Sequence, residues 1–360
     1  MKQLISMMKK ACRSKRALLP MFSVMAMPAS AHVKWFAPYD IVTAPKGIEM
    51  VLTPIFCTIG VLSVLVVFVL ALLDKTLVSV NSRLSSYRYR LTNQVGPEYP
   101  FMVIRYGLLI FFVSIWTIGG IVLTPELKHH SVWISALQLV MIFSLLFNRT
   151  TWVAGVGMFV LWLYAAFHYG FFHLTDYAIF LGIGFFIIYH SAKVDHLNKA
   201  QSFNILYAAI AFTLLWASIE KFVYSQWTFP ILEKLPHIRM GFSKEVFMVL
   251  AGFVEFVLAF LLVSMTGIGF VGGATTLLSM FIAAIWDFGK IDAIGHLMIV
   301  VALFIMIAHG PSRLNYRLAN LHSQPVMNAF FITLIYSVSL VFFFVIYYSI
   351  HNLWLVTAMH

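Results

Sequence analysis

Long apolar runs separated by short polar segments fill this chain from residue 50 almost to its end. Ten of these runs have the length of a membrane-crossing helix, which is about 17 to 25 residues. They are residues 50–73, 101–124, 132–148, 152–172, 175–191, 203–223, 246–266, 267–287, 293–310 and 326–350. Because hydrocarbon cannot satisfy backbone N–H and C=O groups, such segments fold as helices. The pattern predicts an all-α, polytopic membrane protein with about ten transmembrane helices.

Composition narrows where any chemistry can take place. Hydrophobic residues make up 61% of the 360 residues and charged residues 10%, and the mean hydropathy is +0.91. No stretch is left for a soluble domain larger than a loop, so functional groups must lie among the helices or at their ends. The two cysteines, Cys12 and Cys57, fall in separate expected segments, and no disulfide is predicted.

The first 31 residues are typical of a secretory signal peptide. Six basic residues precede or flank the start of the apolar run 17–27, and Ala29-Ser30-Ala31 has the A-x-A form of a cleavage site. An uncleaved first helix is the alternative, but its apolar run is short for a span. Without those six charges, 18 basic residues remain against 13 acidic ones. The high net charge therefore reflects targeting and predicts no nucleic-acid partner.

The signal and the first loop also predict an orientation. Cleavage after Ala31 places His32 on the outer side. The basic residues Lys75, Arg83 and Arg88 that follow the first span then belong on the cytoplasmic side. We therefore expect the mature N-terminus and the C-terminus both to lie outside the cytoplasm.

The spans divide into two units of four helices with a helix on either side. Residues 32–100 hold an outer segment, the first transmembrane helix and a cytoplasmic loop; residues 101–191 and 203–310 form the two units; residues 326–360 form the last helix. Ala165-Ala166, Gly170 and His190 in the first unit have the same order and nearly the same spacing as Ala283-Ala284, Gly289 and His309 in the second. An even number of spans gives the units one orientation, about an axis normal to the membrane. Chance similarity among apolar helices is the alternative.

The second unit resembles the DoxX family of small four-helix bacterial membrane proteins, over about residues 203–310. The motifs that carry the resemblance are Ser218-Ile219-Glu220-Lys221-Phe222, Gly252-Phe253-Val254-Glu255, the run from Leu261-Leu262 to Gly267, and the segment from Gly295-His296 to His309-Gly310-Pro311. The family usually has glycine at the position of Ser218, and the first unit has Gln138 where the second has Glu255. We therefore expect the first unit to be structural.

The resemblance implies a place and a context for the protein. It implies a bacterial inner (plasma) membrane protein, for which the orientation predicted above places the mature termini in the periplasm. It also implies an association with sulfur-linked or quinone-linked electron transfer and with redox partner subunits. Members of this family mostly lack a defined activity, so the residues themselves must carry the functional argument.

Glu255 is the strongest candidate for a functional residue. It lies about ten residues into its span, near the bilayer midplane. An ionised carboxylate there costs about 2.5 kcal/mol or more, so it must be protonated, paired or facing a polar cavity. The plain alternative is a buried hydrogen bond between helices, for instance to Ser218 or to Thr275 and Thr276.

Six polar residues near the outer helix ends of the second unit are predicted to share one polar mouth. They are Glu220, Lys221, Asp287, Lys290, Asp292 and His296. With Glu255, we take Glu220 and Asp287 as candidate catalytic residues, and Lys221 and Asp292 as candidate cofactor-binding residues. Asp287 and Lys290 are spaced i, i+3 and Asp292 and His296 i, i+4, so each pair shares a face if its helix continues. A ring of snorkelling interfacial charges is the alternative.

Histidines concentrate on the predicted outer side and form a candidate metal site. The proposed ligands are His32, His129, His130, His173 and His296. Imidazoles with a nearby carboxylate suit copper or zinc, and an N-terminal His32 would chelate copper through its amine and ring together. No HxH, HExxH or CxxC spacing supports the site, and ordinary interfacial histidines are the alternative.

The residues from His32 to Asp40 pack three aromatic side chains just outside the first span. An amphipathic anchor at the headgroup level is the plain interpretation, and a lid over the helix mouths is the sharper one.

Three functions stay open at this point. The first is a membrane subunit or accessory factor of a quinone-linked redox system. The second is a periplasm-facing protein that binds or transports copper or zinc, and the third is a non-catalytic membrane scaffold. A quinone and copper are the cofactor candidates, and the lipid bilayer is the expected environment. Nothing resembles a nucleotide-binding glycine loop, a Ser-His-Asp signature or a haem-attachment motif, so ordinary soluble catalysis is not expected.

Overall fold

The computed structural model of the chain describes residues 33–40, 42–191 and 196–358, without the side chains of 196–198 and 355–358. The predicted signal peptide, His32 and His360 lie outside the described residues. Regular structure in this part is helical, apart from one antiparallel bridge between Ile121 and Lys128. The first half contains η2 (Val33–Trp35), α2 (Ile48–Val51), α3 (Pro54–Thr76), α4 (Val78–Val95), α5 (Tyr99–Ile118), α6 (Val132–Leu146), α7 (Thr151–Tyr169), α8 (Phe171–Leu174), η3 (Thr175–Tyr177) and α9 (Ala178–Ser191). The second half contains α10 (His196–Val223), η4 (Ser225–Trp227), α11 (Phe229–Lys234), η5 (Pro236–Arg239), α12 (Lys244–Ser264), α13 (Ile268–Gly295), α14 (Leu297–His309), α15 (Arg313–Ala319) and α16 (Pro325–Ala358).

The prediction of a multi-pass helical membrane protein fits the structure, but the count of about ten spans is not confirmed. Eight helices of the described chain are long and apolar enough to cross a membrane, or nine if one bent pair counts as a single span. The predicted span 132–148 is a helix of only 15 residues. The predicted span 293–310 becomes α14, a helix of 13 residues, which meets α15 at a bend of 70°. The predicted span 101–124 ends early, at Ile118, because Gly119 and Gly120 both adopt positive φ and end α5.

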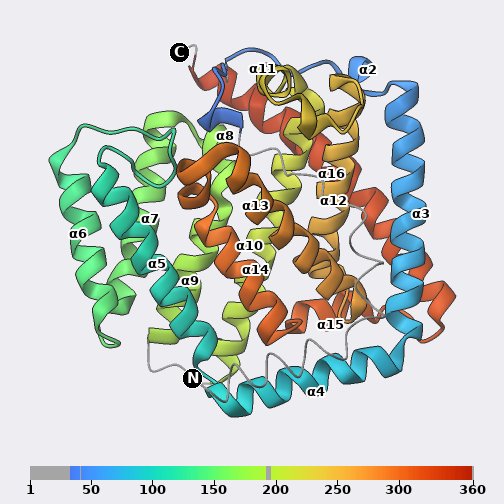
Figure 1. Cartoon of the computed structure of the whole chain (residues 1–360), viewed down its shortest axis with the longest axis horizontal. Coiled ribbons are helices and arrows are strands. Elements are labelled where there is room, and N and C mark those ends of the chain that lie inside the picture. Colours follow the sequence, from blue (N-terminus) through green and yellow to red (C-terminus); the bar gives the residue numbers. More distant parts are fainter. Residues whose placement is uncertain (1–32, 41, 192–195, 359–360) are drawn as a thin grey trace.

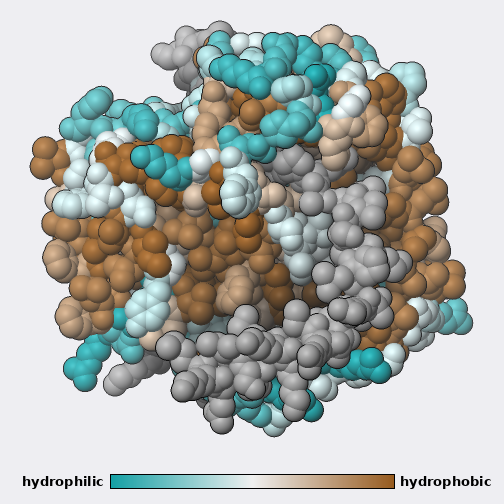
Figure 2. All heavy atoms as spheres, viewed as in Figure 1, coloured by the Kyte–Doolittle hydropathy of each residue, from teal (hydrophilic) through white to brown (hydrophobic). Residues whose placement is uncertain are grey.

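Exposure of apolar side chains follows the expected membrane position. Figure 2 shows a hydrophobic band around the middle of the molecule with hydrophilic residues gathered toward its upper and lower ends. Of the most apolar window of α3, only 22% is buried inside the protein, whereas in α10 the value is 72%. The outward side chains of α3 include Val61, Leu62 and Leu65. We conclude that α3 faces lipid and that α10 lies at the centre.

The two predicted four-helix units pack their helices in the same cyclic order. In residues 101–191, α5 contacts α6, α6 contacts α7, α7 contacts α9, and α9 returns to α5. In residues 203–310, α10, α12, α13 and α14 make the corresponding series of contacts. The units meet through α9 against α10 and through α5 against α14. Exchanging the units maps one of these contacts onto the other, as an axis normal to the membrane requires. Their origin by duplication stays a prediction.

The helices α3 and α16 lie outside the two four-helix units, and shorter segments cover the two ends of the molecule. α3 and α16 pack against each other, and α3 also contacts α12 (Figure 1). α4 lies across the lower end, roughly perpendicular to the spans (Figure 1). Residues 33–47, α2, α11 and the C-terminal end of α16 gather at the opposite end (Figure 1). We call these the α4 end and the lid end. The start of the described chain and its C-terminal helix therefore lie on one side, as the predicted topology requires.

Candidate functional site

A buried lysine joins the N-terminal segment to both four-helix units at the lid end. Lys34 lies in the single turn of η2 and is 5% exposed. Its Nζ lies 2.5 Å from Asp176 Oδ2 and 2.6 Å from Glu220 Oε2. Asp176 belongs to η3 of the first unit and Glu220 to α10 of the second. We call Lys34, Asp176 and Glu220 the Lys34 triad; it holds two carboxylates around one ammonium in a setting where unpaired charge is costly.

Aromatic rings enclose this ammonium and shape its electrostatics. The Nζ atom lies 5.6 Å from the ring centroid of Trp227 and 6.0 Å from that of Tyr39. Burial alone would lower the pKa of Lys34, but the charges of Asp176 and Glu220 outweigh it and raise the pKa well above the ordinary value. Burial, aided by the charge of Glu126, raises the pKa of the Tyr39 phenol to about 12. Lys34 is therefore cationic and Tyr39 neutral at physiological pH.

A second buried group surrounds Glu126, in the loop between α5 and α6. The Tyr177 hydroxyl donates a hydrogen bond to Glu126 Oε1, and His173 Nε2 lies 3.7 Å from the same oxygen. The ring of Tyr39 stacks on His173 with centroids 5.6 Å apart. Burial would raise the pKa of Glu126, but the nearby imidazole of His173 and the hydrogen bond from Tyr177 lower it overall. The residues from Lys34 to Tyr39 thus contact a polar group in the first unit as well.

The same segment covers the helix ends of the second unit. The Trp35 ring packs 4.6 Å from the ring of His296, centroid to centroid. A Cβ atom on Gly295 would lie only 2.2 Å from a Trp35 ring carbon, so only glycine allows this seat. Beneath it, His296 Nδ1 lies 3.0 Å from Asp292 Oδ1, and both side chains are buried. These contacts favour the lid interpretation of this segment over a surface anchor.

Glu255 forms an ion pair with Lys221. Glu255 Oε2 lies 2.5 Å from Lys221 Nζ, and the two side chains are 7% and 12% exposed. Ser218, one suggested partner of Glu255, instead donates to the carbonyl of Leu215. Glu220 and Lys221, which point about 100° apart on α10, therefore take different partners. We call Lys221 and Glu255 the Lys221–Glu255 pair.

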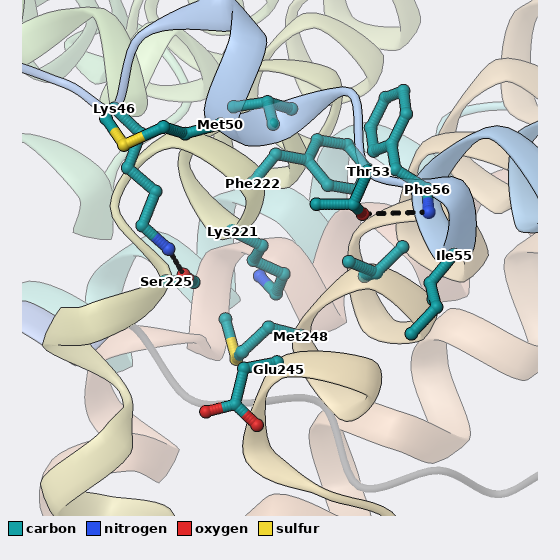
Figure 3. A pocket seen from close by; sticks show the side chains of 12 residues that line it. Lys46, Met50, Thr53, Ile55, Phe56, Lys221, Phe222, Ser225, Glu245 and Met248 are labelled. Carbon is teal, nitrogen blue, oxygen red and sulfur yellow. Dashed lines mark hydrogen bonds between the residues drawn. The ribbon is translucent and has the colours of Figure 1, made fainter.

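Lys221 also lines a hollow between the N-terminal segment, α10 and α12 (Figure 3). The hollow has a volume of about 180 Å³. Its polar lining residues are Lys46, Thr53, Lys221, Ser225 and Glu245, and Lys46 donates a hydrogen bond to Ser225. Its apolar lining includes Met50, Ile55, Phe56, Phe222 and Met248. We call it the lid-end pocket; it lies where α3 and α12 begin.

The lid-end pocket has the character of a site for an amphipathic molecule. Met50 and Ile55 at its rim are 59% and 44% exposed, on the side where α3 faces lipid. Burial lowers the pKa of Lys46, with the charge of Glu245 acting in the opposite direction. An apolar wall with two ammonium groups is suited to a head group that accepts hydrogen bonds and carries a hydrocarbon tail.

The predicted single polar mouth is not formed, because its members separate into distinct pairs. Asp287 Oδ1 lies 2.9 Å from His237 Nε2, and the His237 side chain is 61% exposed. The expected shared face of Asp287 and Lys290 is wrong, because Gly289 adopts φ 73° and kinks α13 between them. The Asp292–His296 spacing does bring that pair together. Among the candidate residues, Lys221 and Glu255 form a buried ion pair, and Lys221 lines the lid-end pocket.

The predicted histidine site does not form within the described chain. In residues 33–40, 42–191 and 196–358 no group of three or more His, Cys, Asp or Glu side chains is placed to hold a metal ion. His173 pairs with Glu126 and His296 with Asp292, whereas His130 is exposed and His129 is buried in the loop after α5. Burial lowers the pKa of His129. The metal prediction is thus left with His32, which lies outside the described residues.

Sequence reasoning missed the role of Lys34 and of Glu126. Lys34 stands between the apolar residues Val33 and Trp35. A lysine with such neighbours could have been recognised as a buried cation that needs an acidic partner. Glu126 stands in a short loop and carried no spacing signal, because its partners His173 and Tyr177 come from another helix end.

Comparison of the chain with models of protein families, with curated proteins and with solved structures gives no match in any of the three. The geometry of the site is therefore the basis on which a function can be proposed.

Proposed function

We propose that this protein binds a quinone-like molecule in the lid-end pocket and serves as a membrane subunit or accessory factor of a redox system. The observation that carries the proposal is that Lys221 belongs both to the wall of a lipid-side pocket and to an ion pair with the one carboxylate set deep in α12. A buried ion pair of this kind adds little stability compared with apolar side chains of similar size. Ionisable residues within a membrane usually mark a functional site.

Each part of the pocket has a role in this proposal. The isoprenoid tail of a quinone would extend toward lipid past Met50 and Ile55, and its ring would pack near Phe56 and Phe222. Lys46 and Lys221 would donate hydrogen bonds to the ring oxygens. When a quinol is oxidised, two electrons pass to a redox partner subunit and two protons are released. The Glu255 carboxylate, which is paired with the pocket residue Lys221, would be a base that accepts one of them.

The family and location belong to the same proposal. The DoxX resemblance of residues 203–310 supports a bacterial inner-membrane protein in a quinone-linked system, with the lid end facing the periplasm. The structure adds that the family-like motif residues Glu220, Lys221 and Glu255 all form buried ion pairs. A scaffold without chemistry would give no reason for a paired lysine to line an open pocket.

Binding of decylubiquinone to the protein in nanodiscs tests the proposal. Saturable quenching of tryptophan fluorescence is expected for the unmodified chain. Affinity should fall at least tenfold in the double variant Lys221→Met/Glu255→Gln, which removes both charges together and so avoids stranding one of them. Glu233→Gln is the matched control, because Glu233 forms an equally short pair with Lys244 at 2.5 Å on the exposed surface.

The outcomes separate the alternatives. Absence of saturable binding in the unmodified protein contradicts the quinone proposal. Co-purifying subunits together with full tolerance of the double variant would favour the scaffold. Copper bound stoichiometrically to the mature protein, and lost in His32→Ala, would favour metal handling.

A further inference from the structure

A second pocket, larger than the first, lies at the α4 end and plays no part in the proposed quinone site. It has a volume of about 340 Å³ and is lined by the ends of α9 and α14 and the beginnings of α5, α10 and α15. Among its lining side chains are Glu98, His190, Lys199, Phe203, His309 and Arg313. We call it the α4-end pocket. Its two histidines are the pair that occupies matching places in the two four-helix units.

Each of these imidazoles is anchored through one nitrogen. His190 Nδ1 lies 3.1 Å from the Phe186 carbonyl and 3.3 Å from Ser202 Oγ. His309 Nδ1 lies 3.2 Å from the Tyr207 hydroxyl. Within the described chain no hydrogen bond uses the Nε2 atom of either ring. The rings pack against Phe203, that of His309 in parallel at 3.9 Å and that of His190 edge-on at 5.6 Å. Both Nε2 atoms are thus available to a ligand in the pocket.

Cations outnumber anions around this pocket. Among the described residues that line it, Lys199 and Arg313 are cationic and Glu98 is the one carboxylate; Glu98 pairs with Lys199 at 2.9 Å and is 56% exposed. Arg313 forms no ion pair within the part of the chain that the structure describes. Its guanidinium is therefore left to solvent or to a bound anion.

A third cation stands directly behind the pocket wall. The Arg88 side chain from α4 packs so closely on Gly310 that a Cβ there would lie 2.8 Å from Arg88 Cδ. Arg88 Nε donates to the carbonyl of Ile307 at 3.2 Å, while its buried Nη2 has no hydrogen-bond acceptor among the described residues. The ionisable groups that face it are the phenols of Tyr99, Tyr207 and Tyr316, and none is a carboxylate. A half-buried guanidinium without an acid partner can attract an anion to the pocket.

We propose that the α4-end pocket binds the phosphate group of an anionic ligand. Lys199 and Arg313 would contact the phosphate oxygens directly, and the rings of His190 and His309 would lie beside the bound phosphate. Arg88 would add its field from behind the wall. Guanidinium and ammonium groups together with imidazoles favour phosphate, which presents several oxygens at once. The phosphate would come either from the head group of a lipid in the adjoining leaflet or from a soluble phosphate ester.

Histidine NMR on the purified full chain tests this proposal. The protein carries ¹⁵N-histidine, and the ring signals are assigned with His190→Gln and His309→Gln. Inorganic phosphate is titrated into protein in phosphate-free detergent, and a second sample compares nanodiscs of phosphatidylcholine with nanodiscs that also contain phosphatidic acid. Saturable shifts of both histidines are expected with at least one probe. Shifts with inorganic phosphate identify a soluble ligand, and shifts with phosphatidic acid alone identify a lipid head group.

Matched variants locate the effect. Lys199→Gln and Arg313→Gln remove the exposed cations of the pocket, and each should weaken binding about tenfold. Arg317→Gln, on the same short helix but outside the pocket lining, should leave the affinity unchanged. The proposal is overturned if neither probe shifts the two histidines, or if the shifts persist undiminished in the Lys199→Gln/Arg313→Gln double variant. Thermal midpoints equal to that of the unmodified protein would show that these variants fold.

Discussion

The two four-helix units place different chemistry at the same position. Gln138 in α6 of the first unit corresponds to Glu255 in α12 of the second. The Gln138 amide is 1% exposed and donates to the carbonyls of Ile121 and Val122 at 2.7 and 3.0 Å. Glu255 instead pairs with Lys221, which lines the lid-end pocket.

The difference shows how one helical framework can support a closed unit and an open one. In the first unit a neutral amide binds the unit's own loop, so its polar atoms are satisfied by backbone. In the second unit the Glu255 carboxylate forms an ion pair with Lys221, which also lines the lid-end pocket. A structural role and a candidate functional role therefore differ in what satisfies the polar group, while the position of the helix stays the same.

The largest expected effect comes from breaking the link that holds the two units to the lid. Lys34→Met leaves Asp176 and Glu220 buried without their cation and should destabilise the protein by about 3–5 kcal/mol. The measurement is chemical unfolding followed by circular dichroism in detergent. The triple variant with Asp176→Asn and Glu220→Gln should recover most of the loss. If Lys34→Met alone proves neutral, the Lys34 triad does not stabilise the assembly.

The next largest change in the free energy of unfolding is expected from substitutions at Gln138 and Glu255. Gln138→Glu sets a carboxylate against two carbonyl oxygens and removes two hydrogen bonds, so a loss of about 2–3 kcal/mol is expected. The double variant Lys221→Met/Glu255→Gln leaves no unpaired charge and should cost about 1 kcal/mol or less. Unfolding free energies of the two variants, measured side by side, test this asymmetry. Equal costs would show that the two positions do the same work.

A smaller effect is expected at the turn between α12 and α13. Asp74, at the end of α3, accepts hydrogen bonds from the backbone N–H groups of Thr266, Gly267 and Gly269 at 2.8 to 3.1 Å. The corresponding turn of the first unit is held by its own Thr150, which donates to the carbonyls of Ser144 and Phe147. Asp74→Ala should cost about 1–2 kcal/mol. Asp74→Asn, which keeps one acceptor, should cost less, and the reverse order would contradict the capping role.

The smallest effect is a change in acid sensitivity in the first unit. The pKa of Glu126 is lower in the folded protein than its usual value near 4.5. Its ionised form therefore adds stability above pH 4.5, and that contribution is lost as the pH falls through the folded-state pKa. Glu126→Gln should make the dependence of the thermal midpoint on pH shallower below pH 4.5. An unchanged slope would show that Glu126 is not stabilised by His173 and Tyr177.

Most of the fold could be predicted because each apolar run carries its own signal. The helices that are long enough to span a membrane, from Pro54–Thr76 to Pro325–Ala358, overlap the predicted runs, whereas α4 (Val78–Val95) forms in a stretch that was expected to be a loop. The number of spans could not, because residues 132–148 and 293–310 are apolar enough for a span but form helices of 15 and 13 residues. The kink at Gly289 was also invisible, because glycine permits a positive φ without requiring it.

The candidate site was only half predictable for a different reason. A carboxylate within an apolar helix marks Glu255 by its cost alone, so the sequence identifies it. Its partner depends on how α10 packs against α12, and no local pattern encodes that. Lys34 and Asp176 lie 142 residues apart, and their meeting depends on both four-helix units being in place.

The lid has a consequence for how the chain matures in the cell. Its first residues leave the ribosome before any of their partners exist: Thr43 receives a hydrogen bond from Tyr224, and Lys46 receives one from Tyr348, 302 positions later. Translation must therefore reach the last helix before every contact of the lid can form, although both acids of the Lys34 triad are made earlier, at positions 176 and 220. The last contacts of the lid would therefore form late in biogenesis. A chain that ends before the last helix would lack the hydrogen bond from Tyr348 to Lys46.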